Sequence, residues 1–311
     1  MKFLIIVLAI FPLVASAESS DVAMETALGP LAGTIVVPDS SDPFAVALII
    51  SGSGPTDRNG NTRGLPGNNN SLKLLAESLS DANIASLRYD KRLIGDSASA
   101  GLTEEDLRFD MYVADARAWI AFVSERFDLP IYVIGHSEGA LIGLLAADSA
   151  DAAGVISIAG PGKRASNLIL EQVSKQLPPD LLIQTEKILN ELEEGRTVKS
   201  PPPVLNALFR ESVQPYLISW FQYDPQAVVA ELDKPILLMY GSTDIQVSAS
   251  DGESLKSSNE KADLIVIQGM NHVLKIVVDD LNEQVRSYSN PSLPIAGEIV
   301  PAIVEFIEKQ N

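Results

Sequence analysis

Short apolar runs alternate with amphipathic stretches along most of this chain. Runs of consecutive apolar residues, bounded by glycine, proline or polar residues, predict buried strands at 44–50, 84–89, 131–134, 155–158, 235–240 and 264–268. Between and after them, apolar residues recur at helical spacing at 71–79, 103–127, 140–147 and 295–308. Strands that are apolar at every position are buried on both faces. The pattern therefore predicts an α/β fold with a mainly parallel sheet and helices on both sides.

Two local signals mark the beginnings of elements. Residues 24–27 and 31–38 flank the turn sequence Leu28-Gly29-Pro30, which predicts an opening β-hairpin. Thr103 and Asp106 have the spacing of a capping box, in which the two residues satisfy each other's backbone N–H groups. We expect the long helix that runs to about residue 127 to begin there.

Residues 163–231 interrupt the alternation of strands and helices. Their helical segments are at 165–177, 180–194, 204–213 and 215–222, with a proline-rich break at 201–203. Because the next strand follows at 235, we expect these residues to be a helical lid inserted over the carboxyl ends of the strands. The expected organisation is an α/β core of residues 18–162 and 232–311 with a lid of residues 163–231.

Residues 1–17 have the pattern of a secretory signal peptide. Lys2 precedes an apolar stretch at 3–14, and Ala15-Ser16-Ala17 is a small-residue cleavage pattern. We therefore expect removal after Ala17 and an exported protein, periplasmic or secreted, without stable membrane insertion of the mature chain. The alternative is an N-terminal anchor that is kept, although the apolar stretch is short for a bilayer span.

Composition narrows the possible chemistry and partners. The chain has 311 residues, of which 46% are hydrophobic, so it can bury one large core. It has no cysteine, which excludes disulfides and thiol chemistry. Its net charge of -18 argues against nucleic acid or an anionic membrane surface as a partner. These properties leave the substrate and the oligomeric state open.

The strand at 131–134 leads into Gly135-His136-Ser137-Glu138-Gly139, which is followed at once by an apolar segment typical of a buried helix. A strand, a sharp turn and a helix are the context in which a Gly-x-Ser-x-Gly serine acts as a nucleophile. A Cβ at either glycine would clash in so tight a turn. We therefore assign Ser137 as the candidate nucleophile; the alternative is a serine that only caps the helix.

A serine nucleophile needs a base and a third group that orients the base. The chain has two histidines. The side chain of His136 should point away from that of its neighbour Ser137 and is interpreted as a packing residue, which leaves His272, directly after the last strand. Asp244 follows a strand at the same edge of the sheet and is the candidate acid. The other aspartates considered are Asp224 and Asp233, in the insertion and at its exit, and Asp263, at the opposite edge.

Attack on a carbonyl creates an oxyanion, which needs donors fixed in advance. The backbone N–H of Glu138, directly after the nucleophile, is one candidate, and the N–H of Ser53 is the other. Ser53 lies in the glycine-rich loop 51–60, which lacks the Gly-Lys-Ser/Thr ending of a phosphate loop; the alternative is an ordinary glycine-rich turn. We expect neither a metal nor a cofactor.

Several motifs occur in a fixed order along the chain. They are the stretch 52–60, Arg88-Tyr89-Asp90-Lys91-Arg92, the stretch 135–139, Asp224-Pro225, the stretch 241–247 and Asn271-His272. With them, from about residue 25 to the end, the chain resembles the α/β-hydrolase superfamily, and within it the bacterial serine esterases related to serine aminopeptidase-like hydrolases and EstD-type carboxylesterases. The order Ser, Asp, His along the chain is that of α/β-hydrolases. Ser51 and Leu93-Ile94-Gly95 depart from the usual pattern of their loops.

The resemblance implies a triad of Ser137, Asp244 and His272 that hydrolyses a carboxylic ester through an acyl-enzyme. We expect a small-molecule ester with a short or medium acyl chain. Alternatives on the same fold are an aminopeptidase-like amidase, an acyl-sugar or aryl esterase, and a lipase. A non-catalytic ligand-binding protein is a further alternative.

Aromatic residues of the insertion are candidates for the wall of an acyl pocket. These residues are Phe209, Tyr216, Trp220 and Phe221. Aromatic residues at helical spacing also commonly form the core of such an insertion, and the sequence leaves both interpretations open.

Overall fold

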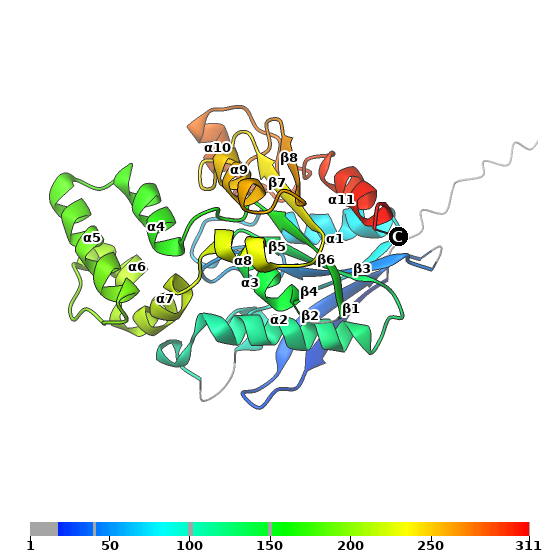
Figure 1. Ribbon diagram of the computed structural model, residues 1–311, viewed down its shortest axis with the longest axis horizontal. Coiled ribbons are helices and arrows are strands. Elements are labelled where there is room, and N and C mark those ends of the chain that lie inside the picture. The colour runs from blue at the N-terminus through cyan, green and yellow to red at the C-terminus, as the bar shows by residue number, and fades with distance from the viewer. Residues whose placement is uncertain (1–17, 40–41, 99–101, 149–150, 311) are drawn as a thin grey trace, which may run out of the picture.

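A computed structural model describes residues 18–39, 42–98, 102–148 and 151–310, so the predicted signal peptide lies outside the described residues. One eight-stranded sheet, in the order β1-β2-β4-β3-β5-β6-β7-β8, forms the centre of the molecule (Figure 1). The strands are β1 (Glu18–Met24), β2 (Leu31–Val37), β3 (Ala45–Ile50), β4 (Ile84–Tyr89), β5 (Ile131–His136), β6 (Ala152–Ile158), β7 (Ile236–Gly241) and β8 (Asp263–Ile267). From β4 to β8 neighbouring strands are parallel, and β2 pairs antiparallel with both β1 and β4.

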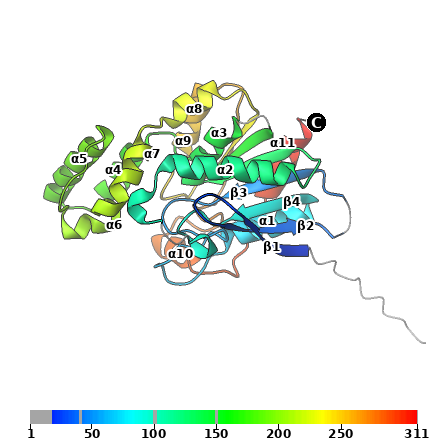
Figure 2. The same cartoon turned by 90° about the horizontal axis from the view of Figure 1, so that it is seen from below.

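Helices cover both faces of the sheet, as Figures 1 and 2 show. Helices α1 (Ser71–Asp81) and α11 (Ile299–Glu308) pack on one face, and α2 (Phe109–Ser124), α3 (Glu138–Ala147) and α9 (Ala249–Ser258) on the other. Strand β3 shows why its apolar run is continuous: Val46 and Leu48 belong to one core cluster, whereas Ala47 and Ile49 belong to the other. The predicted α/β fold is confirmed.

Two predicted boundaries shift by several residues. The hairpin forms, but β1 ends at Met24, which pairs with Leu31, because the N–H of Gly29 closes the turn on the Thr26 carbonyl at 3.0 Å. The capping box of Thr103 and Asp106 also forms, but it caps a single 3-10 turn at Glu104–Asp106. The backbone is extended after that turn, so the long helix begins only at Phe109.

The residues between β6 and β7 are helical, as the sequence predicts. The helices are α4 (Ala165–Ser174), α5 (Pro179–Glu193), α6 (Asn206–Phe209), α7 (Gln214–Phe221) and α8 (Pro225–Glu231). Helices α4 to α7 gather at one end of the molecule, on the left in Figure 1, whereas α8 contacts α3 and α9 of the core. The role of this insertion as a lid stays a prediction.

Two core helices have no counterpart in the sequence prediction. Helix α9 is built mainly of Ser, Asp, Glu and Lys around the buried Leu255, and α10 (Leu281–Ser287) is short and largely polar. Neither has an apolar stripe wide enough to indicate a helix. Among the described helices, none combines the length and the hydropathy needed to cross a bilayer.

Candidate active site

Ser137 occupies a strained turn between β5 and α3. Its backbone has φ 55 and ψ -120, a conformation that residues other than glycine rarely adopt and that marks functional turns. Close packing explains the flanking glycines. A Cβ at Gly135 would lie 2.2 Å from the Gly139 carbonyl oxygen, and a Cβ at Gly139 would lie 2.4 Å from the Ile50 carbonyl oxygen. The turn therefore holds the serine at the carboxyl end of the central strand.

His272 and Asp244 meet beyond the carboxyl ends of β8 and β7. His272 Nδ1 lies 2.7 Å from Asp244 Oδ2, and the side chains are only 7% and 1% exposed. Asp244 Oδ1 accepts hydrogen bonds from the N–H groups of Gln246 at 2.7 Å and Val247 at 3.0 Å. Burial by itself would raise the pKa of Asp244, but His272 and these two donors hold it below its usual value. The carboxylate therefore stays ionised and fixes the imidazole.

The same cavity contains Ser137 and His272. Its volume is about 300 Å³, and its wall includes Ser53, Gly54 and His136. The structure thus brings together three side chains that are far apart in the sequence. The other aspartates have different surroundings: Asp224 caps α8 through Gln226 N, Asp263 begins β8 at the opposite edge, and Asp233 pairs with Lys261 at the surface.

Two backbone N–H groups are available beside the candidate nucleophile. Glu138 is the first residue of α3, where N–H groups lack intrahelical partners. Within the described part of the chain, neither the Glu138 N–H nor the Ser53 N–H has a hydrogen-bond acceptor. The Ser53 loop is fixed by its own bonds: Ser51 Oγ donates to the Thr56 carbonyl at 3.1 Å, and Thr56 Oγ1 donates to the Ser53 carbonyl at 2.8 Å. This arrangement can receive an anionic oxygen.

Comparison with known proteins shows which family the chain belongs to. The family model described as serine aminopeptidase, S33, matches residues 64–276, more than half of the chain. The chain belongs to this family of α/β-hydrolases. The family match covers the turn from Gly135 to Gly139, Asp244 and His272.

Individual proteins resemble this chain in sequence or in fold. Esterase EstD of Thermotoga maritima is 30% identical over 269 residues, which are 85% of this chain and 60% of that protein; the chain thus spans about 60% of the length of this relative. The alpha/beta hydrolase GrgF from Penicillium sp. sh18 has a TM-score of 0.59 at 18% identity, covering 94% of this chain and 99% of that one. Est1E from Butyrivibrio proteoclasticus, solved with ferulic acid bound, has a TM-score of 0.58 at 18% identity, covering 90% and 95%.

His136 makes a contact that sequence reasoning missed. It is buried, and its Nε2 lies 2.8 Å from the carbonyl oxygen of His272. Because a carbonyl oxygen only accepts, Nε2 carries the proton and donates. Burial, together with the nearby His272, lowers the pKa of His136 to about 3. The neutral imidazole therefore supports the backbone of the candidate base.

The neutral state of His136 predicts a loss of stability in acid. An unfolded histidine binds a proton below its ordinary pKa of 6.5, whereas the folded one stays neutral down to about 3. The contribution of the neutral His136 to the free energy of unfolding is therefore fully present above pH 6.5, and it is lost progressively as the pH falls from 6.5 to about 3. Between pH 7 and pH 5 the free energy of unfolding should drop by about 2 kcal/mol more in the wild type than in His136→Gln, whose amide can still donate. Urea unfolding at both pH values measures this; equal drops in the two proteins would contradict it.

The candidate pocket aromatics lie mainly in the interior of the insertion and its contact with α2. Phe209 and Phe221 are 0% and 1% exposed, and Trp220 stacks on Phe109 of α2 with ring centroids 5.8 Å apart. None of these three contributes to the wall of the cavity that contains Ser137. Tyr216 instead lines a neighbouring cavity of about 330 Å³ between the core and the insertion.

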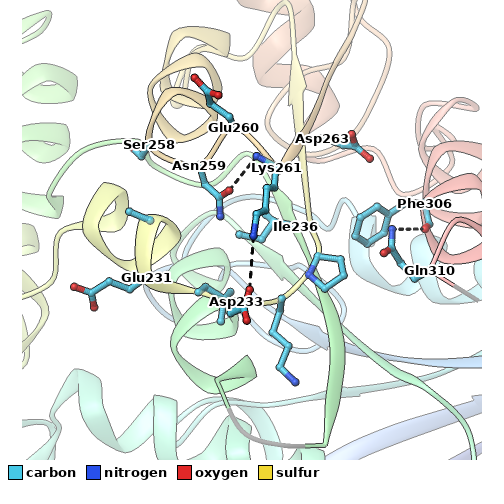
Figure 3. A pocket seen from close by; sticks show the side chains of 14 residues that line it. Glu231, Asp233, Ile236, Ser258, Asn259, Glu260, Lys261, Asp263, Phe306 and Gln310 are labelled. Carbon is cyan, nitrogen blue, oxygen red and sulfur yellow. Dashed lines mark hydrogen bonds and ion pairs between the residues drawn. The ribbon is translucent and has the colours of Figure 1, made fainter.

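A larger hollow of about 790 Å³ lies at the opposite edge of the sheet (Figure 3). It is lined by residues at the amino ends of β7 and β8, among them Ile236 and Asp263, and by Phe306 of α11. The side chains of Asp233 and Lys261 point toward one another there, 3.9 Å apart and exposed. The candidate site lies beyond the carboxyl ends of these strands, so the hollow is on the opposite side of the molecule. Ligands of parallel sheets bind at the carboxyl ends of the strands, which argues against this hollow as the substrate site.

Proposed function

We propose that the protein hydrolyses carboxylic esters through an acyl-enzyme on Ser137. The observation that carries this proposal is the shared cavity of Ser137 and His272, together with the hydrogen bond between Asp244 and Nδ1 of the His272 imidazole. Membership in a serine hydrolase family and the esterase activity named for EstD of Thermotoga maritima support it.

The proposed reaction has two halves. His272 Nε2 accepts the proton of Ser137 as its Oγ attacks the ester carbonyl, and the N–H groups of Ser53 and Glu138 stabilise the oxyanion. His272 then donates that proton to the leaving alcohol. Water, activated by the same histidine, attacks the acyl-enzyme and releases the acid.

The walls of the cavity favour an ester over a peptide with a free amino terminus. An aminopeptidase has to bind the substrate's ammonium group, for which a carboxylate is the natural partner. Among the described residues that line the cavity with Ser137, none is Asp or Glu. The carboxylate of Glu138 is already bound by Lys91 and Tyr216.

A panel of p-nitrophenyl esters from acetate to palmitate, assayed beside aminoacyl p-nitroanilides, tests this proposal. We expect turnover of the shorter esters, with negligible cleavage of the anilides. Preferential cleavage of the anilides would support an aminopeptidase, and a preference for palmitate would support a lipase. Absence of turnover together with absence of fluorophosphonate labelling would support a ligand-binding role.

An apolar groove next to the catalytic cavity is proposed to hold the acyl chain. The groove has a volume of about 520 Å³ and lies between α4 and α10. It shares Leu65, Gln246 and Tyr288 with the cavity of Ser137, so the two spaces adjoin. Ile245 and Val285 line the groove and expose 44% and 60% of their surface. A chain that leaves the small cavity can bury methylene groups there.

Polar substitutions in the groove should reduce the increase in kcat/KM that longer acyl chains give. Each buried CH₂ stabilises by about 0.8 kcal/mol, so kcat/KM should rise by at most about fourfold per methylene from acetate until the groove is filled. Ile245→Asn and Val285→Asn should flatten this rise and keep the rate on acetate. Matched controls are Ile276→Asn and Val278→Asn, whose side chains are 46% and 65% exposed and lie outside both spaces. If the controls flatten the profile equally, the groove is not the acyl site.

We also propose that the protein is exported, with cleavage after Ala17. The pattern of residues 1–17 supports this. N-terminal sequencing of protein from the native host should begin at Glu18; a retained Met1 would support an anchor instead.

A further inference from the structure

A buried lysine contacts Glu138, which provides one candidate oxyanion donor, and the carbonyl of Gly52, which shares a peptide unit with the other donor. Lys91 follows β4 by two residues and is 1% exposed. Its Nζ donates to the Gly52 carbonyl at 2.6 Å and to Glu138 Oε2 at 2.6 Å. The ammonium also lies 5.0 Å from the centroid of the Tyr112 ring, a favourable cation–π arrangement. One side chain thus joins the glycine-rich loop to the start of α3.

The contact with Gly52 fixes a donor directly. The carbonyl of Gly52 and the N–H of Ser53 belong to the same peptide unit, which is planar, so the two groups point in opposite directions. When Lys91 holds the carbonyl on one side, the N–H is held on the other, where Ser53 lines the cavity of Ser137. A cation on the carbonyl also polarises the peptide and strengthens its N–H as a donor.

The contact with Glu138 fixes the second donor. The Glu138 carboxylate, 2% exposed, belongs to the residue whose backbone N–H begins α3 beside the nucleophile. Its Oε2 is held by Lys91, and its Oε1 accepts from the hydroxyl of Tyr216, on helix α7 of the insertion (Figure 1). The same ammonium therefore sets the relative position of the two donor residues.

We propose that Lys91 is a positioning residue for the oxyanion hole. This role rests on the proposed function, because it matters only if an oxyanion forms at Ser137. A buried ion pair costs desolvation, and apolar residues of similar volume often stabilise a fold as well or better. Its placement at both donors accounts for the cost: it aligns the N–H groups of Ser53 and Glu138 before the reaction begins.

Lys91→Met tests the role. Poorly aligned donors lose stabilisation of the oxyanion more than binding of the planar ester, so kcat should fall by about 10²- to 10³-fold and KM should change by less than about threefold. A trifluoromethyl ketone provides a second reading. Ser137 adds to its carbonyl, the proton moves to His272, and the oxyanion of the adduct occupies the hole. Its Ki should rise in parallel with the loss of kcat/KM.

A neighbouring ion pair supplies the control. Arg92 and Asp115 are each 4% exposed and paired at 2.6 Å, and in the described part of the chain neither makes a hydrogen bond or ion pair with Gly52 or Glu138. Arg92→Met should lower the melting temperature comparably to Lys91→Met but leave kcat and the ketone Ki within about threefold. Lys91→Arg, which keeps the cation, should recover at least about tenfold of the lost kcat. If Lys91→Met does not fold, Lys91→Gln is judged by the same two readings.

The outcomes separate this role from the proposed function. The positioning role would be overturned if folded Lys91→Met kept its kcat and its Ki for the ketone, or if Arg92→Met changed both values equally. The proposed function would still hold in that case, provided that Ser137→Ala is inactive. Wild-type rates in Ser137→Ala would overturn the proposed function, and the positioning role with it.

Discussion

Ser137→Ala is expected to abolish ester hydrolysis, with kcat falling by about 10⁶-fold if the three residues act as a unit. Without Oγ, no acyl-enzyme can form, and His272 has no serine proton to accept. The residual rate should come from the oxyanion donors and substrate binding alone. Steady-state hydrolysis of p-nitrophenyl acetate and butyrate measures the loss, and a fluorophosphonate probe should label the wild type but not the variant.

The fold should tolerate this change. Alanine has the same Cβ as serine, so the strain of a positive φ at position 137 is unchanged, and no described hydrogen bond uses Ser137 Oγ. Unfolding curves should therefore agree to within about 0.5 kcal/mol. Ser242→Ala, which removes a hydroxyl that accepts from Gly269 N outside the cavity, serves as the matched control and should keep most of the rate. A folded Ser137→Ala protein with wild-type turnover would refute the nucleophile assignment.

The sheet could be predicted because each of its parallel strands is marked locally. Strands buried on both faces are continuous apolar runs, and the turn at Ser137 needs glycines at two positions where a Cβ would meet a carbonyl oxygen. Asp244 and His272 follow their strands directly, so a parallel sheet places them at one edge without any knowledge of the loops.

Contacts between distant side chains could not be predicted in the same way. Lys91 and Glu138 are 47 positions apart, and nothing in the sequence around either residue indicates the other. The hydrogen bond from His136 to the His272 carbonyl joins residues 136 positions apart. It forms because the fold buries both residues next to each other. The groove of Ile245 and Val285 was missed because α10 has no apolar stripe that marks it as a helix.

Asp244→Asn should lower kcat by about 10⁴-fold, although it keeps the size of the side chain and removes only its negative charge. The backbone N–H groups of Gln246 and Val247 both point at Oδ1, so the amide oxygen of the asparagine must take that place. Its NH₂ group then faces Nδ1 of His272, which has to accept instead of donate. The proton of the neutral imidazole moves to Nε2, the atom that must be free to take the proton of Ser137.

The same reasoning predicts which variants should restore or keep the rate. Asp244→Glu keeps the charge, so any loss through misplacement should be smaller than in Asp244→Asn. Asp224→Asn and Asp263→Asn alter aspartates at a helix cap and at the opposite sheet edge, and should stay within about threefold of the wild type. The measurement is kcat on p-nitrophenyl butyrate in folded proteins. If Asp224→Asn or Asp263→Asn loses as much activity as Asp244→Asn, or if Asp244→Asn keeps its rate, the orienting acid is not Asp244.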